Sequence, residues 1–174
     1  LILLLKPFAV GDYISVTQEG IEGTVKEIQI FYTKMATVDN QTVVVPNSIL
    51  TSNCLTNVTA RPERKLDLKV GISYNADMKA AKRIVENMLR SDPSVIQDEE
   101  IVVFVSDLAD SAVIIGLRAW VKTEEYWATR WRLLEQIKTR FDEAGIEIPY
   151  NQITVHMAGT ASDERQTGMS DEGK

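Results

Sequence analysis

The chain has 174 residues, 44% of them hydrophobic and 25% charged, and a formal net charge of −6. This length allows one ordinary domain or two small ones, and the composition excludes a disordered or collagen-like protein. The acidic balance also argues against a nonspecific nucleic-acid binder, which normally carries a basic stripe.

The chain opens on five large aliphatic residues, Leu1 to Leu5. Two interpretations stay open: these residues begin a buried strand, or they are the cut end of a longer apolar helix. We favour the helix, because the chain opens in the middle of an apolar run. No stretch approaches the roughly 20 apolar residues that cross a bilayer, and the cationic start and cleavage site of a signal peptide are absent. Lys6-Pro7 ends whatever precedes it, because proline removes a backbone donor.

Short strands are predicted between residues 8 and 58. They cover residues 13–16, 23–28, 30–38 and 42–45. Asp39-Asn40 predicts a two-residue hairpin turn, because both residue types tolerate positive φ. Pro46-Asn47 stops the strand before it. Several short strands at this spacing predict a small β barrel or sandwich.

The second half alternates between strands and helices. Residues 66–70 alternate as a half-buried strand does. Asn75 is the expected N-cap of a helix, and Pro93 lies just beyond that helix. Its apolar face is predicted to contain Met78, Ala81, Ile84, Val85, Met88 and Leu89. Two strands are then predicted around a turn at residues 107–111, over residues 101–105 and 112–121.

A second helix follows, with Gly145 as its C-terminal cap. Glutamates near its start and basic residues near its end match the helix dipole. Its apolar face is predicted to contain Trp127, Trp131, Leu134, Ile137, Phe141 and Ala144. With a last strand at residues 153–155, the order is βαββαβ, a ferredoxin-like α+β domain. We place the domain boundary near residues 59–62, and residues from 158 onward are small and polar.

Residues that could carry chemistry are sparse. One cysteine, Cys54, and one histidine, His156, do not make up the three or four ligands of a zinc site. Cys54 has no neighbouring base and is predicted to be an inert thiol, and His156 is predicted to be a surface or packing residue. Asp107 and Asp110 resemble a carboxylate pair for acid–base work or Mg²⁺, but they flank a tight turn in which aspartates are common. We predict no catalytic residue, metal or cofactor.

Four segments resemble motifs of the small-conductance mechanosensitive channel (MscS) family, in the family's order. Residues 6–14, KPFAVGDYI, resemble the junction at which the pore-lining helix of these channels meets a β domain. Residues 20–28, GIEGTVKEI, are similar to a family strand, and residues 44–48, VVPNS, to the motif that closes the β domain. Residues 141–150, FDEAGIEIPY, resemble a segment near the end of the family's cytoplasmic region.

The resemblance implies a division of the chain. Residues 1–7 would be the cytoplasmic end of the pore-lining transmembrane helix, and residues 8–60 a small Sm-like β barrel or sandwich. Residues 61–157 would form the ferredoxin-like α+β domain, and residues 158–174 a C-terminal tail. We expect part of the tail, residues 160–167, to be held by neighbouring subunits around the ring axis.

The resemblance also implies a function. This portion would be the cytoplasmic cage of a homo-oligomer, a heptamer, in the cell (inner) membrane. The channel would open under membrane tension and release ions and osmolytes in hypo-osmotic shock. Membrane lipid would contact a transmembrane region upstream of Leu1, and neither an enzymatic activity nor a nucleic-acid partner is expected. Coupling of pore to cage is expected from Leu5, Lys6, Pro7 and Phe8, and a scaffold role from Gly23, Pro46 and Asn47.

Two other functions remain open on the residues alone. Small β barrels and ferredoxin-like domains both host RNA-binding modules, but the acidic charge and the absence of aromatic residues on an exposed strand face count against one. Trp127 and Trp131 share the apolar helix face, and we interpret them as core residues rather than as a stacking platform. The second alternative is a metabolic enzyme or ligand-sensing domain, with the turn at Asp107 and Asp110 as its site.

Overall fold

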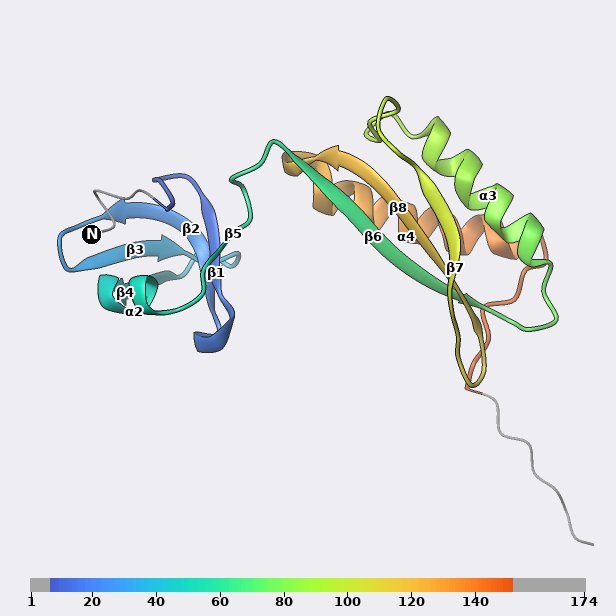
Figure 1. The fold of residues 1–174 in the computed structure, drawn as a ribbon, viewed down its shortest axis with the longest axis horizontal. Coiled ribbons are helices and arrows are strands. Elements are labelled where there is room, and N and C mark those ends of the chain that lie inside the picture. The colour runs from blue at the N-terminus through green and yellow to red at the C-terminus, as the bar shows by residue number, and fades with distance from the viewer. Residues whose placement is uncertain (1–6, 152–174) are drawn as a thin grey trace, which may run out of the picture.

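A computed structural model describes residues 7–151, which form two domains joined by a short linker (Figure 1). The first domain is a five-stranded antiparallel sheet in the order β4-β3-β2-β1-β5, with one short helix, α2. Its elements are β1 (Tyr13–Val16), β2 (Ile21–Ile28), β3 (Tyr32–Ala36), β4 (Thr42–Pro46), α2 (Asn47–Ser52) and β5 (Thr56–Asn57), with a 3-10 turn at Thr17–Glu19. Among the described residues the sheet does not close into a barrel, since β4 and β5 remain at its edges.

The first domain has a small apolar core. In β1 and β3, buried residues alternate with partly exposed ones, as period-two packing on one face requires. The buried apolar side chains are Phe8, Ile14, Val16, Val25, Met35, Val45 and Leu50. A single layer of strands and one helical turn therefore cover few side chains.

The loop between β3 and β4 differs from the predicted two-residue turn. The N–H of Thr37 donates to the carbonyl of Gln41 at 2.9 Å, which leaves three residues in the loop. The N–H of Asn40 donates to the carbonyl of Thr37 at 2.9 Å, and Asn40 has φ of 66°. A turn followed by one left-handed residue is the usual three-residue hairpin loop, and asparagine tolerates that conformation.

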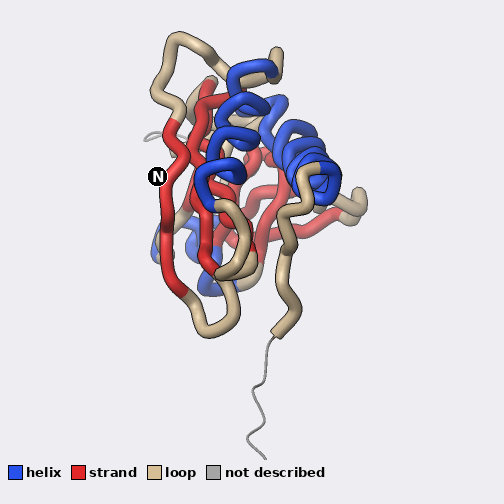
Figure 2. The backbone as a smooth tube through the Cα atoms, turned by 90° about the vertical axis from the view of Figure 1, so that its right-hand side faces the viewer, coloured by secondary structure: helices blue, strands red, loops and turns tan. Residues whose placement is uncertain are grey.

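The second domain places two helices on one face of a three-stranded antiparallel sheet (Figure 2). The sheet order is β6-β8-β7, with the last of these strands in sequence at the centre. The elements are β6 (Glu63–Ile72), α3 (Met78–Ser91), β7 (Val102–Leu108), β8 (Val113–Lys122) and α4 (Tyr126–Glu143), with a 3-10 turn at Thr123–Glu125. This order confirms the predicted α+β fold class. The predicted strand at 153–155, His156 and the tail lie outside the described residues.

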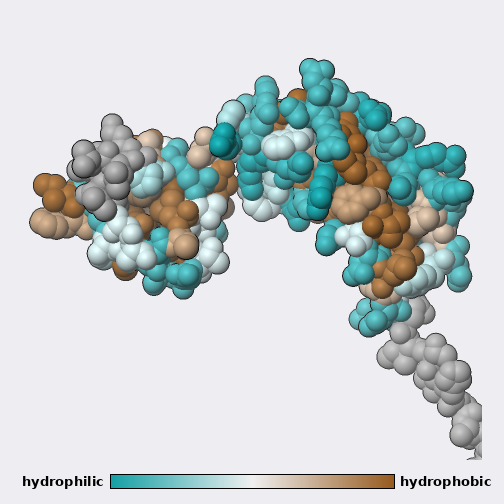
Figure 3. Space-filling view, in the orientation of Figure 1, coloured by the Kyte–Doolittle hydropathy of each residue, from teal (hydrophilic) through white to brown (hydrophobic). Residues whose placement is uncertain are grey.

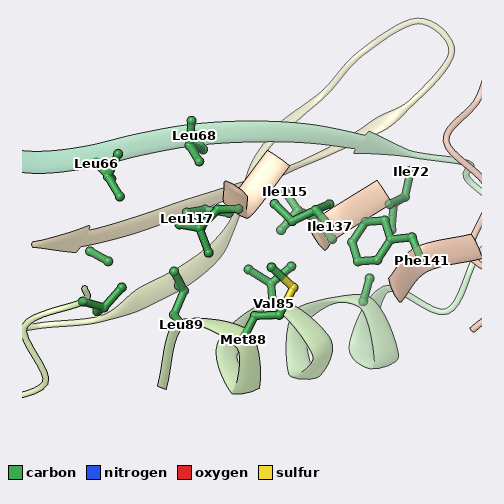
Figure 4. Packing of buried hydrophobic residues seen from close by; sticks show 14 of the residues in the cluster. Leu66, Leu68, Ile72, Val85, Met88, Leu89, Ile115, Leu117, Ile137 and Phe141 are labelled. Carbon is green, nitrogen blue, oxygen red and sulfur yellow. The ribbon is translucent and has the colours of Figure 1, made fainter. Parts of the chain in front are cut away.

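The core of this domain lies between the sheet and both helices (Figure 4). Strand β8 contributes a row of alternate buried residues, because its other face points away from the helices. Helix α3 buries Ala81, Val85, Met88 and Leu89, as predicted, although Met78 is exposed.

The predicted apolar face of α4 is wrong in part. Ile137 and Phe141 are buried, but Trp127 is 53% exposed and Trp131 is 64% exposed. The buried stripe is made instead by Thr129, Leu133, Ile137 and Phe141. Their spacing of four keeps these residues on one side of the helix, and it leaves the two indoles on another side. Leu134 and Ala144, which were placed on the buried face, are exposed as well.

The ends of the helices use local polar groups. The N-cap of α3 is Asp77 rather than Asn75: its carboxylate accepts hydrogen bonds from the backbone N–H groups of Lys79 and Ala80, at 2.9 and 3.0 Å. Gly145 has φ of 68°, and Ile146 N–H donates to the Phe141 carbonyl at 2.8 Å. The predicted cap at Gly145 is confirmed, and this bond is part of a Schellman motif.

Candidate functional site

The site singled out by the sequence motifs lies where the chain enters the first domain. Residues 7–12, the lead-in segment, run into β1. Pro7 is exposed, whereas Phe8 is 3% exposed and belongs to the apolar core. Of the residues expected to couple pore to cage, the structure therefore places Phe8 in the domain core, while Leu5 and Lys6 lie outside the described residues.

Strand β2 holds the lead-in segment by its backbone. The N–H of Gly11 donates to the carbonyl of Val25, and the N–H of Val25 donates to the carbonyl of Asp12, both at 2.8 Å. Gly11 has φ of 99°, a conformation that side chains rarely adopt. The glycine of the motif therefore lets the chain turn from the lead-in segment into β1.

Asn47, the first residue of α2, binds the turn between β2 and β3 and also β3 itself. Its side-chain amide donates to the carbonyls of Gln29 and Ile30, at 2.8 and 3.0 Å. Its side-chain oxygen accepts from the hydroxyl of Thr33 at 2.8 Å, and its backbone N–H donates to the carbonyl of Phe31 at 2.8 Å. One asparagine at the start of α2 thereby provides hydrogen-bond donors for the backbone carbonyls of the turn between β2 and β3.

The fold favours proline at position 46 and glycine at position 23 for two different reasons. Pro46 ends β4, pairs with Tyr32 and precedes the first residue of α2, where its fixed φ of −58° suits the approach to a helix. A Cβ atom at Gly23 would lie 2.6 Å from the carbonyl oxygen of Ala36. Strands β2 and β3 therefore approach closely at this point, which only glycine permits.

A cleft of about 520 Å³ lies between the two domains. Tyr13 and Glu22 line one wall. The pKa of the Tyr13 phenol is raised, mainly by burial and to a smaller extent by the nearby Glu22 carboxylate. Trp127 and Trp131 line the opposite wall with ring centroids 6.0 Å apart. The exposed indoles that sequence reasoning assigned to the core thus border an interdomain cleft.

The residues considered for chemistry do not converge in the described part of the chain. Asp107 lies within β7 rather than in the turn, where its carboxylate accepts from the N–H of Leu108 at 2.8 Å. The turn is closed instead by Ala109 N–H donating to the carbonyl of Ala112 at 2.9 Å. Cys54 is exposed. Within residues 7–151, no group of three or more His, Cys, Asp or Glu side chains could hold a metal ion.

Comparison with known proteins identifies the class. Residues 1–60 match the family model described as "Mechanosensitive ion channel, beta-domain". Residues 66–148 match the model described as "Mechanosensitive ion channel MscS, C-terminal". The two matches follow one another in the order of the two domains. The chain belongs to the MscS family of mechanosensitive ion channels, which is a family of channels and not of enzymes.

Relatives at about one-third identity support this assignment. The chain is 33% identical over 157 residues to a small-conductance mechanosensitive channel of Edwardsiella ictaluri, a match that covers 90% of this chain and 54% of that protein. It is 31% identical over 166 residues to a large-conductance mechanosensitive channel of Methanocaldococcus jannaschii, covering 90% of this chain and 45% of that protein. The chain thus spans about half the length of the curated relatives it matches.

Solved structures show the same fold. The structure of Helicobacter pylori MscS in a closed state matches with a TM-score of 0.83 at 24% identity, covering 91% of this chain and 62% of that one. Arabidopsis thaliana MSL1 matches with a TM-score of 0.69 at 22% identity, covering 86% and 56% of the two chains. Among the described residues, no helix is both long enough and apolar enough to span a membrane.

Proposed function

We propose that this chain is the cytoplasmic cage portion of a mechanosensitive channel subunit. The observation that carries the proposal is the match of both domains, in order and over 91% of the chain, to the fold of a closed MscS channel. In this proposal the protein sits in the cell (inner) membrane and assembles as a homo-heptamer. It opens under membrane tension and releases ions and osmolytes in hypo-osmotic shock, without a cofactor, a catalytic step or nucleic acid.

The proposal assigns roles at the junction. Leu5, Lys6, Pro7 and Phe8 connect a membrane-embedded pore to the cage. Support comes from Phe8, whose burial in the core fixes the lead-in segment to the domain. Gly23, Pro46 and Asn47 are scaffold residues, supported by the close approach at Gly23 and the hydrogen bonds of Asn47.

The test uses the full-length protein that contains this chain. It is expressed in a bacterial strain that lacks mechanosensitive channels, and survival of hypo-osmotic shock is compared with an empty vector. Patch recordings then measure opening against applied tension, and native mass spectrometry in detergent measures the number of subunits. Rescue, tension-gated currents and seven subunits are expected. A well-expressed protein that gives neither rescue nor tension-gated currents contradicts the proposed function.

A further inference from the structure

Two segments that are distant in sequence meet at the side chain of Asp12. The N–H of Ala9, in the lead-in segment, donates to Asp12 Oδ2 at 2.9 Å. The side-chain amide of Asn57, in β5, donates to the same oxygen at 2.8 Å. One carboxylate oxygen therefore binds both the start of the first domain and the segment that leaves it. Hydrogen bonds to an ionised acceptor are stronger than those between neutral groups.

Thr59 extends this contact into the interdomain linker. The N–H of Tyr13 donates to Thr59 Oγ1 at 2.9 Å, and the N–H of Val58 donates to the carbonyl of Tyr13 at 2.8 Å. The Thr59 hydroxyl lies 3.5 Å from Asp12 Oδ1 and 3.3 Å from Asn57 Oδ1, and can donate to either. The first residues of the linker are thus fixed to the start of β1.

The other end of the linker is fixed to the second domain. The N–H of Thr123 donates to the carbonyl of Pro62 at 2.8 Å, and its hydroxyl donates to the carbonyl of Arg61 at 2.6 Å. Thr123 follows β8 and begins the turn that leads into α4. Only Ala60 separates Thr59 from Arg61. Two Cα steps reach at most about 7 Å, so the linker has almost no slack between its two anchors.

We propose that Asp12, Thr59 and Thr123 form a tie that passes movement of the lead-in segment directly to the second domain. The inference rests on the proposed function, in which the start of the lead-in segment connects the pore to the cage, so that opening under tension moves this segment. Along the covalent chain, the same movement would have to pass through the whole first domain before it reached the linker. Through the tie, it passes from Asp12 to Thr59 and then to the start of α4. Asp12 is a positioning residue in this scheme, because it acts through the linker and not at the pore.

Variants at both ends of the tie test this in the full-length protein. Asp12→Asn preserves the shape of the side chain, but removes its charge and one acceptor oxygen. Thr123→Val removes the hydroxyl bond to Arg61 and keeps the backbone bond to Pro62. Asp39→Asn is the matched control, because the Asp39 carboxylate also accepts local hydrogen bonds in the first domain, from Thr37 and Gln41 of the β3–β4 loop.

Two measurements are made on each variant. Hydrogen exchange of peptides over residues 57–62 reports the tie through the N–H of Thr59, which donates to Asn57 Oδ1 at 3.2 Å. Asp12→Asn weakens the bond that holds the Asn57 side chain in place, and we expect roughly tenfold faster exchange. Patch recordings report the midpoint tension for opening, which we expect to shift in Asp12→Asn and in Thr123→Val by more than in Asp39→Asn.

The two measurements separate the possible failures. Faster exchange with a shifted midpoint tension supports the tie. Faster exchange with a wild-type midpoint tension in both variants overturns its role in coupling. Unchanged exchange in Asp12→Asn, or an equal change in Asp39→Asn, overturns the tie itself. A wild-type protein that does not open under tension overturns the proposed function and the role in gating, and the exchange rates then decide only whether the tie exists.

Discussion

The two domains hold themselves together in different ways. Among its described residues, the first buries seven apolar side chains under a single sheet. It also depends on polar contacts such as the three side-chain hydrogen bonds of Asn47. The second buries 17 apolar side chains between a sheet and two helices. The apolar area removed from water provides most of the stability of a domain. The second domain therefore gains more stability from its apolar core than the first does. We therefore expect core substitutions to decide the stability of the second domain, and single polar contacts to decide that of the first.

The largest effect is expected in the core of the second domain. Phe141→Ala removes a fully buried ring and should lower the free energy of unfolding of that domain by about 3–5 kcal/mol. Trp131→Ala is the matched control on the same helix, and should change it by less than about 0.5 kcal/mol, because that side chain is largely exposed. Urea unfolding followed by circular dichroism measures both. Similar losses in the two variants would contradict the observed orientation of α4.

A smaller but more local loss is expected in the first domain. Asn47→Ala leaves the buried Thr33 hydroxyl and the Gln29 carbonyl without their partner, at a cost of about 2–3 kcal/mol. The transition of the first domain should move to lower urea concentration while that of the second stays in place. Asn87→Ala, an exposed change on α3, serves as the control. A shift of both transitions to lower urea concentration would show that the two domains unfold together, which contradicts separate stabilisation of the first domain by Asn47.

Gly23→Ala tests the close approach of β2 and β3. The added methyl group would lie within 3.0 Å of the Ala36 backbone, so the strands must shift, at about 1–3 kcal/mol. Thermal unfolding compared with Thr24→Ala, the next residue of β2, measures the difference. An alanine at position 23 that is as well tolerated as one at position 24 would show that the strands can separate at little cost.

The smallest effect is a pH dependence at the start of α3. Hydrogen bonds from the N–H of Ala80, and then from that of Lys79, hold the pKa of Asp77 below its usual value of 3.8. A carboxyl whose pKa is lowered by folding contributes stability above its unfolded pKa and loses it as pH falls through the folded value. Asp77→Ala should therefore be less stable than wild type near neutral pH, and the gap should shrink below about pH 4. A gap that stays constant down to pH 2 would mean that the charge of Asp77 does not matter.

Much of the fold could be predicted because it follows from local chemistry. Gly145, which must adopt a left-handed conformation, marked the end of α4, and the alternation of residues 66–70 marked a strand that the structure confirms as part of β6. The side of α4 that faces the sheet could not be predicted in the same way. Tryptophan is usually buried, and only the packing of Leu133 and Ile137 against the sheet turns Trp127 and Trp131 outward.

The candidate site was predictable in its residues but not in its contacts. The motifs located Phe8, Gly23 and Asn47, yet they did not show which groups these residues touch. Asp12 was part of a motif but was not singled out, because its partners Asn57 and Thr59 lie more than 40 residues away in sequence. The residue types of Asp39-Asn40 predicted a hairpin turn between two strands. The pairing of Thr37 with Gln41, which sets the length of the loop at three residues, became visible only in the structure.

On the face of the second sheet that the helices do not cover, side chains of the sheet itself cover the backbone. A Cβ at Gly116 would lie 2.6 Å from the ring of Phe104, so that ring rests directly on the β8 backbone, and the Arg118 guanidinium lies 5.0 Å from its centroid. On the same face, the Lys65 ammonium lies 5.0 Å from the Trp120 ring. Figure 3 shows apolar residues along β7 between hydrophilic ones. Because charged groups of Arg118 and Lys65 lie over these two rings, this face of the sheet can stay in contact with water without a second layer of helices.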